Sequence, residues 1–336
     1  MTLRIAINGF GRIGRLVTRA IAEHDLKDVE LVAINTPSPV DMSAHLLRYD
    51  SVHGRFVSKV EEGEDYIDFG RGKVKMTHER DPLNINWDNV DVVMECTGVF
   101  RDRESAGKHL EVGAKSVLIS APAQDIDKTI VYGVNDKDLT KDDRVVSCAS
   151  CTTNCLAPLA KVLLDTVGIS RGFMTTVHAY TQDQRILDNS HKNKYRARAA
   201  GQNMIPTSTG AARAVGLVLP ELDGKLSGSA VRVPTANVSM VDLAFQPEKD
   251  TSIEELNAAM KAASESYMKD VIHYTEEALV SSDINHDPHS TVFAAPLTKV
   301  IGGDLVKVIA WYDNEWGFAN RMVDVARVMS NRIGSA

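Results

Sequence analysis

The sequence contains no uninterrupted apolar run of about 18 residues, so it offers no candidate for a membrane-spanning helix. Its first residues, MTLRIAINGFG, lack a basic stretch followed by a long apolar one, so we expect no secretory signal. A basic excess is also missing, because 38 Lys and Arg stand against 45 Asp and Glu, a net charge of −7. This balance argues against a nucleic-acid binder, although a local group of donors could still bind an anionic substrate.

Cysteine is scarce, with four residues at positions 96, 148, 151 and 155. A secreted disulfide framework would be denser and more spread out, so we expect a cytoplasmic protein. Hydrophobic residues (43%) and charged residues (25%) are close to globular averages, which excludes a disordered or fibrous chain. The length of 336 residues predicts about two domains, large enough to fold without a disulfide or metal.

The first 150 residues alternate between strand and helix patterns. Leu3–Ile7 and Val29–Ile34 are apolar runs typical of buried strands, and Gly11–Glu23 between them has helical spacing. Similar apolar runs follow at Val92–Cys96, Ser116–Ile119 and Val145–Val146. We therefore predict that residues 1–150 form a dinucleotide-binding domain of the Rossmann type, an α/β doubly wound fold.

The pattern changes after Ser150. Longer strands, which we expect to have no regular helices between them, are predicted at Leu226–Val233, Val238–Phe245, Ser290–Ala294 and Leu305–Tyr312. We interpret residues 151–316 as an α+β catalytic domain with a mixed or antiparallel sheet, and residues 317–336 as a C-terminal helix that packs back on the first domain. The long polar segment 180–209 is expected to be functional or docked on a partner.

A glycine motif follows the first predicted strand. Gly9, Gly11 and Gly14 fit G-x-G-x-x-G at the start of a predicted helix, which is the context that a dinucleotide site requires. Gly9 would permit the tight turn, Gly11 would let a pyrophosphate approach the backbone, and Gly14 would let the helix pack closely on the strand. The alternative is a purely structural glycine turn.

The end of the second predicted strand bears on the choice of cofactor. NAD-preferring sites place an Asp or Glu there for the adenosine ribose, but this strand ends at Asn35 and Thr36. The hydroxyls of Thr36 and Ser38 can donate to a phosphate, which favours NADP or the use of both cofactors. In the alternative interpretation, Thr36 is a turn residue and NAD is held by other contacts.

The densest reactive chemistry lies at the junction of the two predicted domains. Cys151 is expected in the first turn of a helix, where the dipole and the unpaired N–H groups favour the thiolate. His178, at the end of an apolar run, is the candidate base, since such a base need not be near in sequence. Histidines in such positions are, however, often structural.

A metal or dithiol site is the rival interpretation of the cysteines. Cys148 and Cys151 form a C-x-x-C pair, and Cys155 follows. A fourth ligand is lacking, because Cys96 sits in a predicted buried strand and Cys155 is equally well explained as a small buried residue. We therefore predict no metal site.

Several long motifs in the same order resemble those of the phosphorylating glyceraldehyde-3-phosphate dehydrogenases. They are INGFGRIGR, SCASCTTNCLAPLAK, TTVHAYT, MIPTSTGAARAVG, VRVPTANVS and WYDNEWGFANR. The resemblance covers nearly the whole chain. It implies a homotetramer in which residues 180–209 cross a subunit interface toward a neighbour's cofactor site, a small-molecule substrate, and no nucleic-acid or membrane partner.

The resemblance also implies roles for individual residues. Cys151 resembles the nucleophile and His178 the base that activates it. Cofactor-binding positions are matched by Gly9, Gly11, Arg12, Ile13, Gly14, Thr36, Arg80, Ser120, Asn189, Ser190 and Asn314. Positions that hold the attacking phosphate are matched by Ser150, Thr152, Thr209 and Gly210, and those that hold the substrate's own phosphate by Thr181 and Arg232. Arg196 and Arg198 are both candidates for a further phosphate contact.

The sequence departs from the usual family pattern in four places. Cys148 replaces a common Asn and Phe318 a frequent Tyr, while Thr36 replaces the usual Asp and Asn189-Ser190 a frequent Leu-Pro. The last two changes remove features hostile to a 2′-phosphate. They predict dual specificity, with NADP at least competitive with NAD.

The implied reaction is the reversible oxidative phosphorylation of D-glyceraldehyde 3-phosphate to 1,3-bisphosphoglycerate, in glycolysis or gluconeogenesis. It runs through a cysteine thiohemiacetal and thioester, with hydride transfer to NAD(P). Erythrose-4-phosphate dehydrogenase is the nearest alternative, although the Thr207–Gly210 segment argues against it. A nucleotide-binding protein with a thiol or metal switch is the alternative from another functional class.

Overall fold

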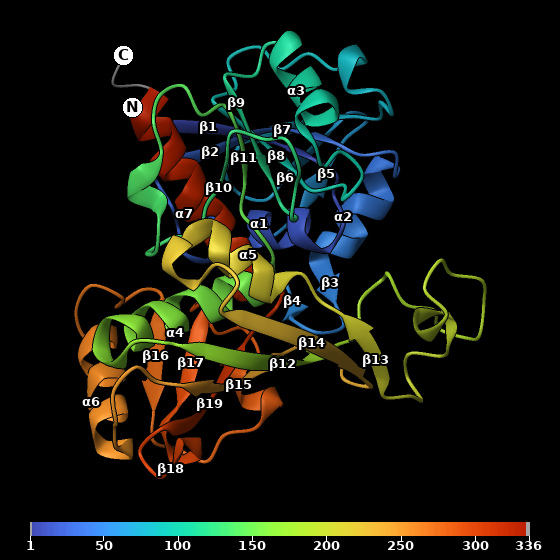
Figure 1. Cartoon of the computed structure of the whole chain (residues 1–336). Helices are drawn as coiled ribbons and strands as arrows, with labels where there is room; N and C mark the ends of the chain where they lie inside the picture. Colours follow the sequence, from blue (N-terminus) through green and yellow to red (C-terminus); the bar gives the residue numbers. More distant parts are fainter. Residues whose placement is uncertain (1, 334–336) are drawn as a thin grey trace. The chain divides into compact units, whose positions relative to one another are not determined.

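The computed structural model describes residues 2–333. The chain divides into two compact units, Met1–Ser150 with Phe318–Ala336, and Cys151–Gly317 (Figure 1). The first unit contains a mixed sheet in the order β10-β11-β9-β8-β1-β2-β7-β6-β5. Its strands are β1 (Leu3–Asn8), β2 (Val29–Asn35), β5 (Glu61–Glu62), β6 (Tyr66–Asp68), β7 (Lys73–Thr77), β8 (Val92–Glu95), β9 (Ser116–Ile119), β10 (Lys128–Thr129) and β11 (Val145–Ser147). A separate small pair is formed by β3 (Tyr49–Asp50) and β4 (Gly54–Arg55).

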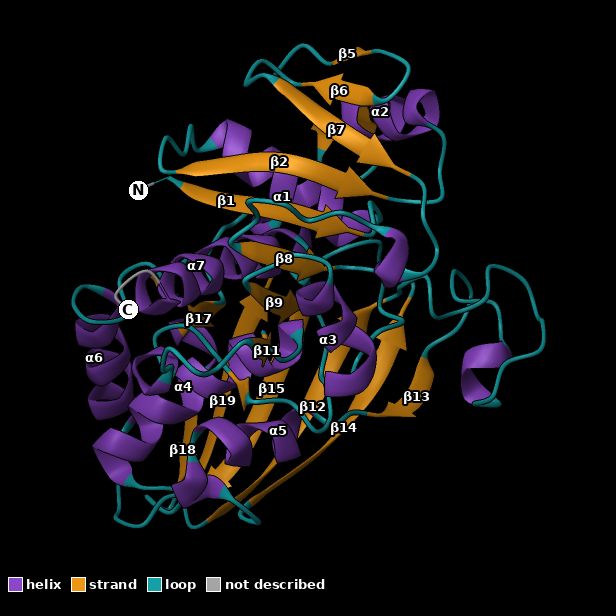
Figure 2. Ribbon diagram, turned by 90° about the horizontal axis from the view of Figure 1, so that it is seen from above, coloured by secondary structure: helices purple, strands orange, loops and turns teal. Residues whose placement is uncertain are grey.

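Strand order in this sheet places a switch point at β1. The chain passes from β1 to β2 on one side and later returns to β8 on the other, and both neighbours run parallel to β1 (Figure 2). Ligands of open α/β sheets bind beyond the carboxyl ends of strands at such a point. Gly9 follows β1 directly, so the predicted glycine turn lies where the topology favours a ligand.

Helices of the first unit are α1 (Arg12–Glu23), α2 (Val40–Arg48), α3 (Arg103–Glu111) and the part of α7 (Trp316–Ile333) from Phe318 onward. Short 3-10 turns are η1 (Pro82–Asn84) and η2 (Asp136–Asp138). Arg327 of α7 donates two hydrogen bonds, of 2.8 and 2.7 Å, to the carboxylate of Asp28 just before β2. This ion pair joins the C-terminal helix to the strand-connecting turn of the same unit.

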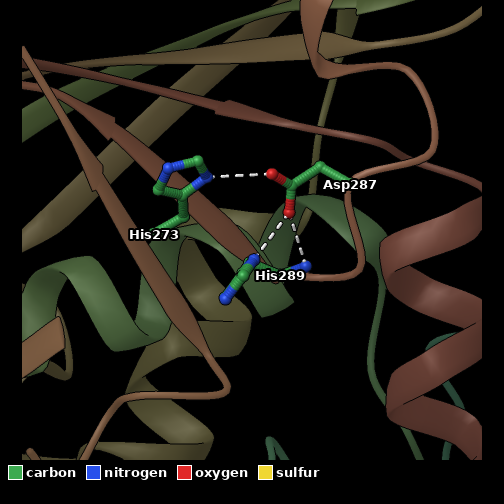
Figure 3. A group of neighbouring side chains, drawn as sticks. All are labelled: His273, Asp287 and His289. Carbon is green, nitrogen blue, oxygen red and sulfur yellow. Dashed lines mark hydrogen bonds and ion pairs between the residues drawn. The ribbon is translucent and has the colours of Figure 1, made fainter. Parts of the chain in front are cut away.

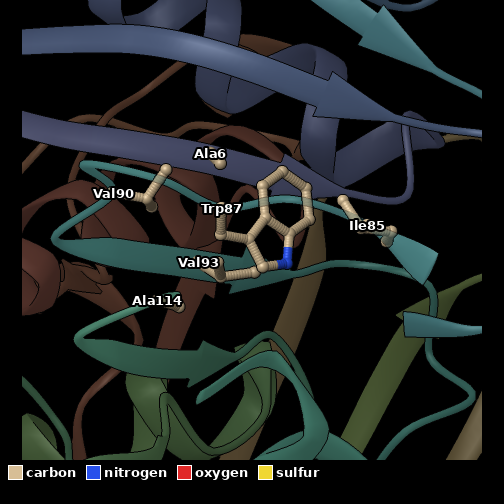
Figure 4. Packing of buried hydrophobic residues seen from close by; sticks show 6 residues of the cluster. All are labelled: Ala6, Ile85, Trp87, Val90, Val93 and Ala114. Atoms are coloured by element: carbon tan, nitrogen blue, oxygen red, sulfur yellow. The ribbon is translucent and has the colours of Figure 1, made fainter. Parts of the chain in front are cut away.

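One hydrophobic cluster beside the sheet centres on Trp87 (Figure 4). The indole is 1% exposed, and its Nε1–H donates to Nδ1 of the fully buried His109 at 2.9 Å. His109 in turn lies 3.1 Å from the buried Glu95 carboxylate, which also accepts from the Asn8 amide. The end of β1, immediately before Gly9, is therefore fixed by a buried polar network.

The second unit is built on a sheet in the order β13-β14-β12-β15-β19-β17-β16, with β18 paired to β19. Its strands are β12 (Arg171–Ala179), β13 (Ile205–Ser208), β14 (Leu226–Val233), β15 (Ser239–Gln246), β16 (Ile272–Thr275), β17 (Thr291–Ala294), β18 (Lys299–Ile301) and β19 (Leu305–Tyr312). Pairs β12–β14 and β16–β17 are parallel and the rest antiparallel, so this sheet is mixed. The helices α4 (Cys151–Val167), α5 (Ala211–Val218) and α6 (Ile253–Ser264) pack on it.

The expectation of no regular helix between the long strands was wrong. Helix α6 lies between β15 and β17 and turns its apolar Leu256, Met260 and Ala263 inward. Its N-cap Ser252 accepts a hydrogen bond from the backbone N–H of Glu255. These residues show helical spacing and a capping signal that the strand-rich surroundings obscured.

The polar segment 180–209 extends from the sheet near β13 (Figure 1). It contains a 3-10 turn, η3 (Tyr195–Ala197), and ends in β13, which pairs with β14. The remaining 3-10 turns of the unit are η4 (Pro220–Leu222), η5 (Ser281–Ile284) and η6 (Ala295–Leu297). Within the range 2–333, none of the helices combines the length and hydropathy that crossing a bilayer requires.

Candidate active site

Cys151 is the first residue of helix α4. Strand β11 ends at Ser147, and Ala149 adopts a left-handed backbone conformation with φ of 57°. The N–H of Ala149 donates to the Ser147 hydroxyl at 2.9 Å, which closes the turn into the helix. Backbone N–H groups in the first helical turn have no partner within the helix, so the thiol lies among donors that can stabilise an oxyanion.

His178 faces this thiol from the central strand β12. Its Nε2 lies 3.5 Å from Sγ of Cys151, and its Nδ1 lies 2.7 Å from the carbonyl oxygen of Ala179. The carbonyl can only accept, so Nδ1 carries the proton and Nε2 presents its lone pair to the thiol. Neighbouring strands β14 and β15 hold β12 on both sides, which fixes the ring's position.

Both partners of this pair are biased toward their neutral forms. Burial raises the pKa of Cys151, although the charge of Arg232 and hydrogen bonds from Thr152 act in the opposite direction. Burial, assisted by the charges of Arg232 and Arg196, lowers the pKa of His178 to about 3. The thiolate expected from the helix N-terminus is therefore disfavoured, because desolvation of Cys151 outweighs the charge of Arg232 and the hydrogen bonds at the helix start.

Tyr312, at the end of β19, completes the surroundings of the pair. Its buried hydroxyl is hydrogen-bonded to Thr152 at 2.8 Å and to Thr176 at 2.9 Å. Its ring meets the His178 imidazole edge-on, with centroids 6.0 Å apart. The sequence analysis did not single out Tyr312, although it lies in the motif WYDNEW.

A group of donors lies beside His178 on the next strand. Arg232 is the register partner of His178 across β12 and β14. One of its terminal nitrogens donates to the Ala179 carbonyl at 3.1 Å and to the Thr181 hydroxyl at 3.2 Å. Its Nε and the Nε2 of Gln184 are buried and have no hydrogen-bond partner among residues 2–333. These unused donors fit an anion, and Gln184 is a residue that the sequence analysis missed.

The structure separates the two arginines left open by the sequence. Arg196 bonds Thr207 through Nε at 3.0 Å and pairs with the Asp183 carboxylate, and its charge acts on His178 and Arg232. The exposed Arg198 is paired instead with Asp188 at 2.8 Å. Arg196 is thus the one near the catalytic pair.

The remaining residues predicted to hold the attacking phosphate are placed differently. Thr209 is half-buried, and its hydroxyl accepts from the N–H of Ala211 at the start of α5. Gly210 is exposed at the N-cap of that helix, and Ser150 is half-buried beside Cys151. The hydroxyl of Thr152 is hydrogen-bonded to Tyr312, and both this hydroxyl and the backbone N–H of Thr152 act on Cys151 through hydrogen bonds.

The glycine motif of the first unit has the predicted stereochemistry. Gly9 has a φ of 98°, and a Cβ there would lie 2.6 Å from the backbone nitrogen of Thr97. A Cβ on Gly14 would lie 2.3 Å from the carbonyl oxygen of Gly9, whereas one on Gly11 would have no atom within 4 Å. Gly11 therefore leaves open space before the N-terminus of α1, as a pyrophosphate would need, so the residues present fit a dinucleotide.

Arg12 and Ile13, both half-buried, open α1. The Arg12 guanidinium contacts Asp50 at 2.5 Å. Burial alone would raise the pKa of Asp50, but hydrogen bonds from Arg12 and from the N–H groups of His53 and Val52 lower it to about 2. Arg80 is exposed, and Ser120, directly after β9, is half-buried.

Thr36 lies directly after β2 and is 4% exposed. Its hydroxyl accepts from the N–H of Ser38 at 3.4 Å, and its carbonyl oxygen lies 2.8 Å from Nδ1 of His78. A pocket of about 450 Å³ adjoins this turn. Residues lining it are Pro37, Pro39, Val40, Asp41, Glu64 and His78. Two carboxylates and one imidazole therefore surround the space beside Thr36.

The remaining predicted cofactor residues lie in the second unit. Asn314 is buried, and its Oδ1 accepts from the Ser239 hydroxyl at 2.7 Å. Asn189 and Ser190 are exposed in the segment 180–209. Arg185 donates to the Ser190 carbonyl at 3.0 Å, which steadies the turn that carries them.

Each of the two units matches a known family model. Residues 3–103 match the family model "Glyceraldehyde 3-phosphate dehydrogenase, NAD binding domain", and residues 150–314 match the corresponding "C-terminal domain". The glyceraldehyde-3-phosphate dehydrogenase of Cereibacter sphaeroides is 60% identical over 98% of this chain and 99% of that protein. Those of Xanthobacter flavus and Zymomonas mobilis are 57% identical (98% of this chain, 99% of that protein) and 54% identical (99% and 100%).

These matches support the main interpretation of the sequence over the erythrose-4-phosphate and switch-protein alternatives. They also show that the chain has a domain that binds a nicotinamide dinucleotide and that it is an oxidoreductase of glycolysis. The chain belongs to the glyceraldehyde-3-phosphate dehydrogenase family.

Proposed function

We propose that Cys151 and His178 carry out the chemistry of this family on D-glyceraldehyde 3-phosphate. The observation that carries the proposal is the 3.5 Å approach of Sγ to an imidazole nitrogen that bears no proton. As sulfur adds to the aldehyde carbon, its proton passes to Nε2 of His178, and the new oxyanion accepts hydrogen bonds from N–H groups at the start of α4.

Collapse of the thiohemiacetal needs a base and a hydride acceptor. A bound nicotinamide dinucleotide supplies the acceptor. His178 gives its proton to the oxyanion, which becomes the hemiacetal hydroxyl, and takes the same proton back as hydride leaves the carbon, so that an acyl thioester remains on Cys151. Inorganic phosphate attacks this carbonyl, the thiolate leaves, and the product is an acyl phosphate.

Two anion sites serve these steps. We assign the substrate's own phosphate to Arg232 and Thr181, with the unpartnered Nε2 of Gln184 as a further donor. We assign the attacking phosphate to Arg196, Thr209, Gly210, Ser150 and the N–H of Thr152. Arg196 also pairs with a carboxylate, that of Asp183, but its charge acts on His178 and Arg232. Arg198 is left out of both sites because its side chain is exposed and paired with Asp188.

Initial-rate measurements with glyceraldehyde 3-phosphate and phosphate test this assignment. Cys151→Ser should abolish turnover, because a hydroxyl beside a neutral imidazole is a far weaker nucleophile. Cys148→Ser is the matched control and should have a mild effect. Turnover by the Cys151→Ser variant would overturn the proposal.

For the cofactor, we propose that the chain uses both NAD and NADP. Support comes from Thr36, which puts no carboxylate at the end of β2, and from the small polar pair Asn189-Ser190. Asp41 and Glu64 face the adjoining pocket and oppose a 2′-phosphate, so a comparison of kcat/KM for the two cofactors is a sharp test. A preference for NAD by several orders of magnitude would contradict dual use.

Thr36→Asp provides the complementary experiment. A carboxylate at this position would repel the 2′-phosphate, so kcat/KM with NADP should fall by about tenfold or more while that with NAD is kept. Thr36→Ser, which keeps a hydroxyl and adds no charge, is the matched control and should leave both kcat/KM values nearly unchanged. Equal losses with both cofactors would show that position 36 does not discriminate between them.

We further propose that the protein is a cytoplasmic homotetramer in which residues 180–209 dock on a neighbouring subunit. Several large apolar side chains in this segment are exposed: Ile186 (89%), Leu187 (73%), Tyr195 (62%) and Met204 (75%). Such a concentration in one extended segment is typical of a protein interface.

A further inference from the structure

A second cluster of ligand-type side chains lies in the catalytic unit, outside the residues assigned above. His273 comes from the sheet-edge strand β16, and Asp287 and His289 come from the connection between η5 and β17 (Figure 3). The ligand atoms of the three residues all lie within 4.8 Å of one another. Among residues 2–333, this is the only group of three or more His, Cys, Asp or Glu side chains so arranged.

The Asp287 carboxylate lies between the two imidazoles. Its Oδ2 is 2.9 Å from Nδ1 of His273, and its Oδ1 is 2.7 Å from Nδ1 of His289. Oδ1 also accepts from the backbone N–H of His289 at 2.8 Å, which fixes the carboxylate on its own loop. The two rings and the carboxylate therefore converge on one small volume.

Neighbouring backbone contacts hold the cluster in place. Strands β16 and β17 pair in parallel, and the N–H of Ser290 donates to the Val271 carbonyl at 3.0 Å. A Cβ at Gly317 would lie 2.7 Å from the His289 carbonyl oxygen, so this glycine lets α7 begin close to the loop. The side chains of Asp287 and His289 retain 17% and 27% exposure and that of His273 42%, so an ion can enter from solvent.

From this arrangement we propose that His273, Asp287 and His289 form a binding site for a zinc ion. Two imidazoles and one carboxylate are ligands that suit zinc, whereas magnesium and calcium prefer oxygen ligands throughout. Tetrahedral zinc with ligands at about 2.0–2.2 Å places ligand atoms about 3.4 Å apart. The two His–Asp contacts, of 2.9 and 2.7 Å, would have to lengthen by about 0.5 and 0.7 Å to admit the ion, and water would fill the fourth position.

Two alternatives predict different results in solution. The cluster could be a hydrogen-bonded triad that binds no ion. Two His and one carboxylate also hold iron(II) in some enzymes, but zinc binds most N/O sites more tightly than iron(II) does. The zinc assignment thus requires that the site binds zinc measurably and that it binds zinc more tightly than iron(II).

Calorimetric titration of the chelator-treated full chain with Zn²⁺ tests the site. The Cys151→Ser background is used throughout, because a reactive thiol could bind zinc itself. We expect one zinc ion per chain, and a loss of affinity of more than about tenfold on His273→Gln or His289→Gln. His45→Gln, which removes an exposed histidine of α2, is the control and should leave the affinity unchanged.

Cobalt(II) identifies the ligands independently. Its visible spectrum in the Cys151→Ser background should indicate N/O coordination without a sulfur-to-metal charge-transfer band, and His273→Gln should remove that spectrum. His273 lies on an edge strand, so its variant should keep the thermal midpoint of the parent in chelator, which separates lost ligation from misfolding. No zinc binding, binding that His273→Gln leaves intact, or tighter binding of iron(II) than of zinc would each overturn the proposal.

Discussion

At the scale of single residues, the proposed function depends on which ring nitrogen of His178 carries the proton. The Ala179 carbonyl fixes the tautomer, and burial with two nearby arginines keeps the ring neutral. A neutral imidazole is ready to accept a proton at any pH well above about 3. The base therefore needs no prior deprotonation step in the neutral range.

Replacing His178 should separate catalysis from binding. His178→Asn should lower kcat by about 10²–10⁴, the usual value of one acid–base group, with little change in KM for the aldehyde. Steady-state kinetics measure both constants. A rise in KM at unchanged kcat would assign the imidazole to substrate binding instead.

The depressed pKa also makes stability depend on pH. The unfolded chain binds a proton at His178 below its ordinary pKa of 6.5, whereas the folded chain does so only below about 3. The contribution of His178 to the free energy of unfolding therefore falls as the pH is lowered from about 6.5 toward about 3.

Urea unfolding between about pH 4 and pH 7 measures this dependence. We expect His178→Asn to flatten the curve relative to the parent, while His45→Asn, which changes an exposed histidine, should leave it unchanged. An identical slope in the parent and in His178→Asn would show that the ring titrates normally in the folded protein.

At the scale of elements, the turn between β1 and α1 separates structural from ligand-binding glycines. Gly9 and Gly14 have backbone atoms where a Cβ would stand, whereas Gly11 faces open space. Gly11→Ala should fold with nearly unchanged stability but bind NAD about tenfold or more weakly, because its methyl group would meet the pyrophosphate.

Fluorescence titration with NAD and a thermal melt of the free protein test this pair of expectations. Gly107→Ala, in the middle of α3 with nothing within 4 Å of its Cβ, is the matched control and should keep full affinity. Unchanged NAD affinity in the Gly11→Ala variant would show that the pyrophosphate does not bind at this turn.

At the scale of the whole molecule, the exposed apolar residues of 180–209 predict assembly. Leu187→Asp should shift the protein toward smaller oligomers in sedimentation experiments, because a charge in an apolar interface has to be desolvated. Val57→Asp, at an equally exposed apolar position elsewhere, should leave assembly unchanged. Equal behaviour of the two variants would exclude the segment from the interface.

Much of the fold could be predicted because its signals are local. The glycine motif and the apolar runs indicate a βαβ unit from adjacent residues alone, as they do for β1, α1 and β2. The approach of Cys151 to His178 was expected from the family resemblance. The contacts of Tyr312 and of the His273 cluster join distant strands and loops, which periodicity does not encode. The role proposed for Gln184 rests on its buried, unpartnered Nε2, which only the folded structure reveals.

The positive charge of Arg232 lowers the pKa of both Cys151 and His178, which favours the ionised thiol but disfavours the protonated imidazole. If the substrate phosphate docks on Arg232, as proposed above, it would cancel that charge and make the imidazole more basic. Cancelling the same charge would also withdraw its help to the Cys151 thiolate. The proposed phosphate contact would therefore leave proton transfer to His178, during addition of the sulfur, as the route by which the thiol reacts.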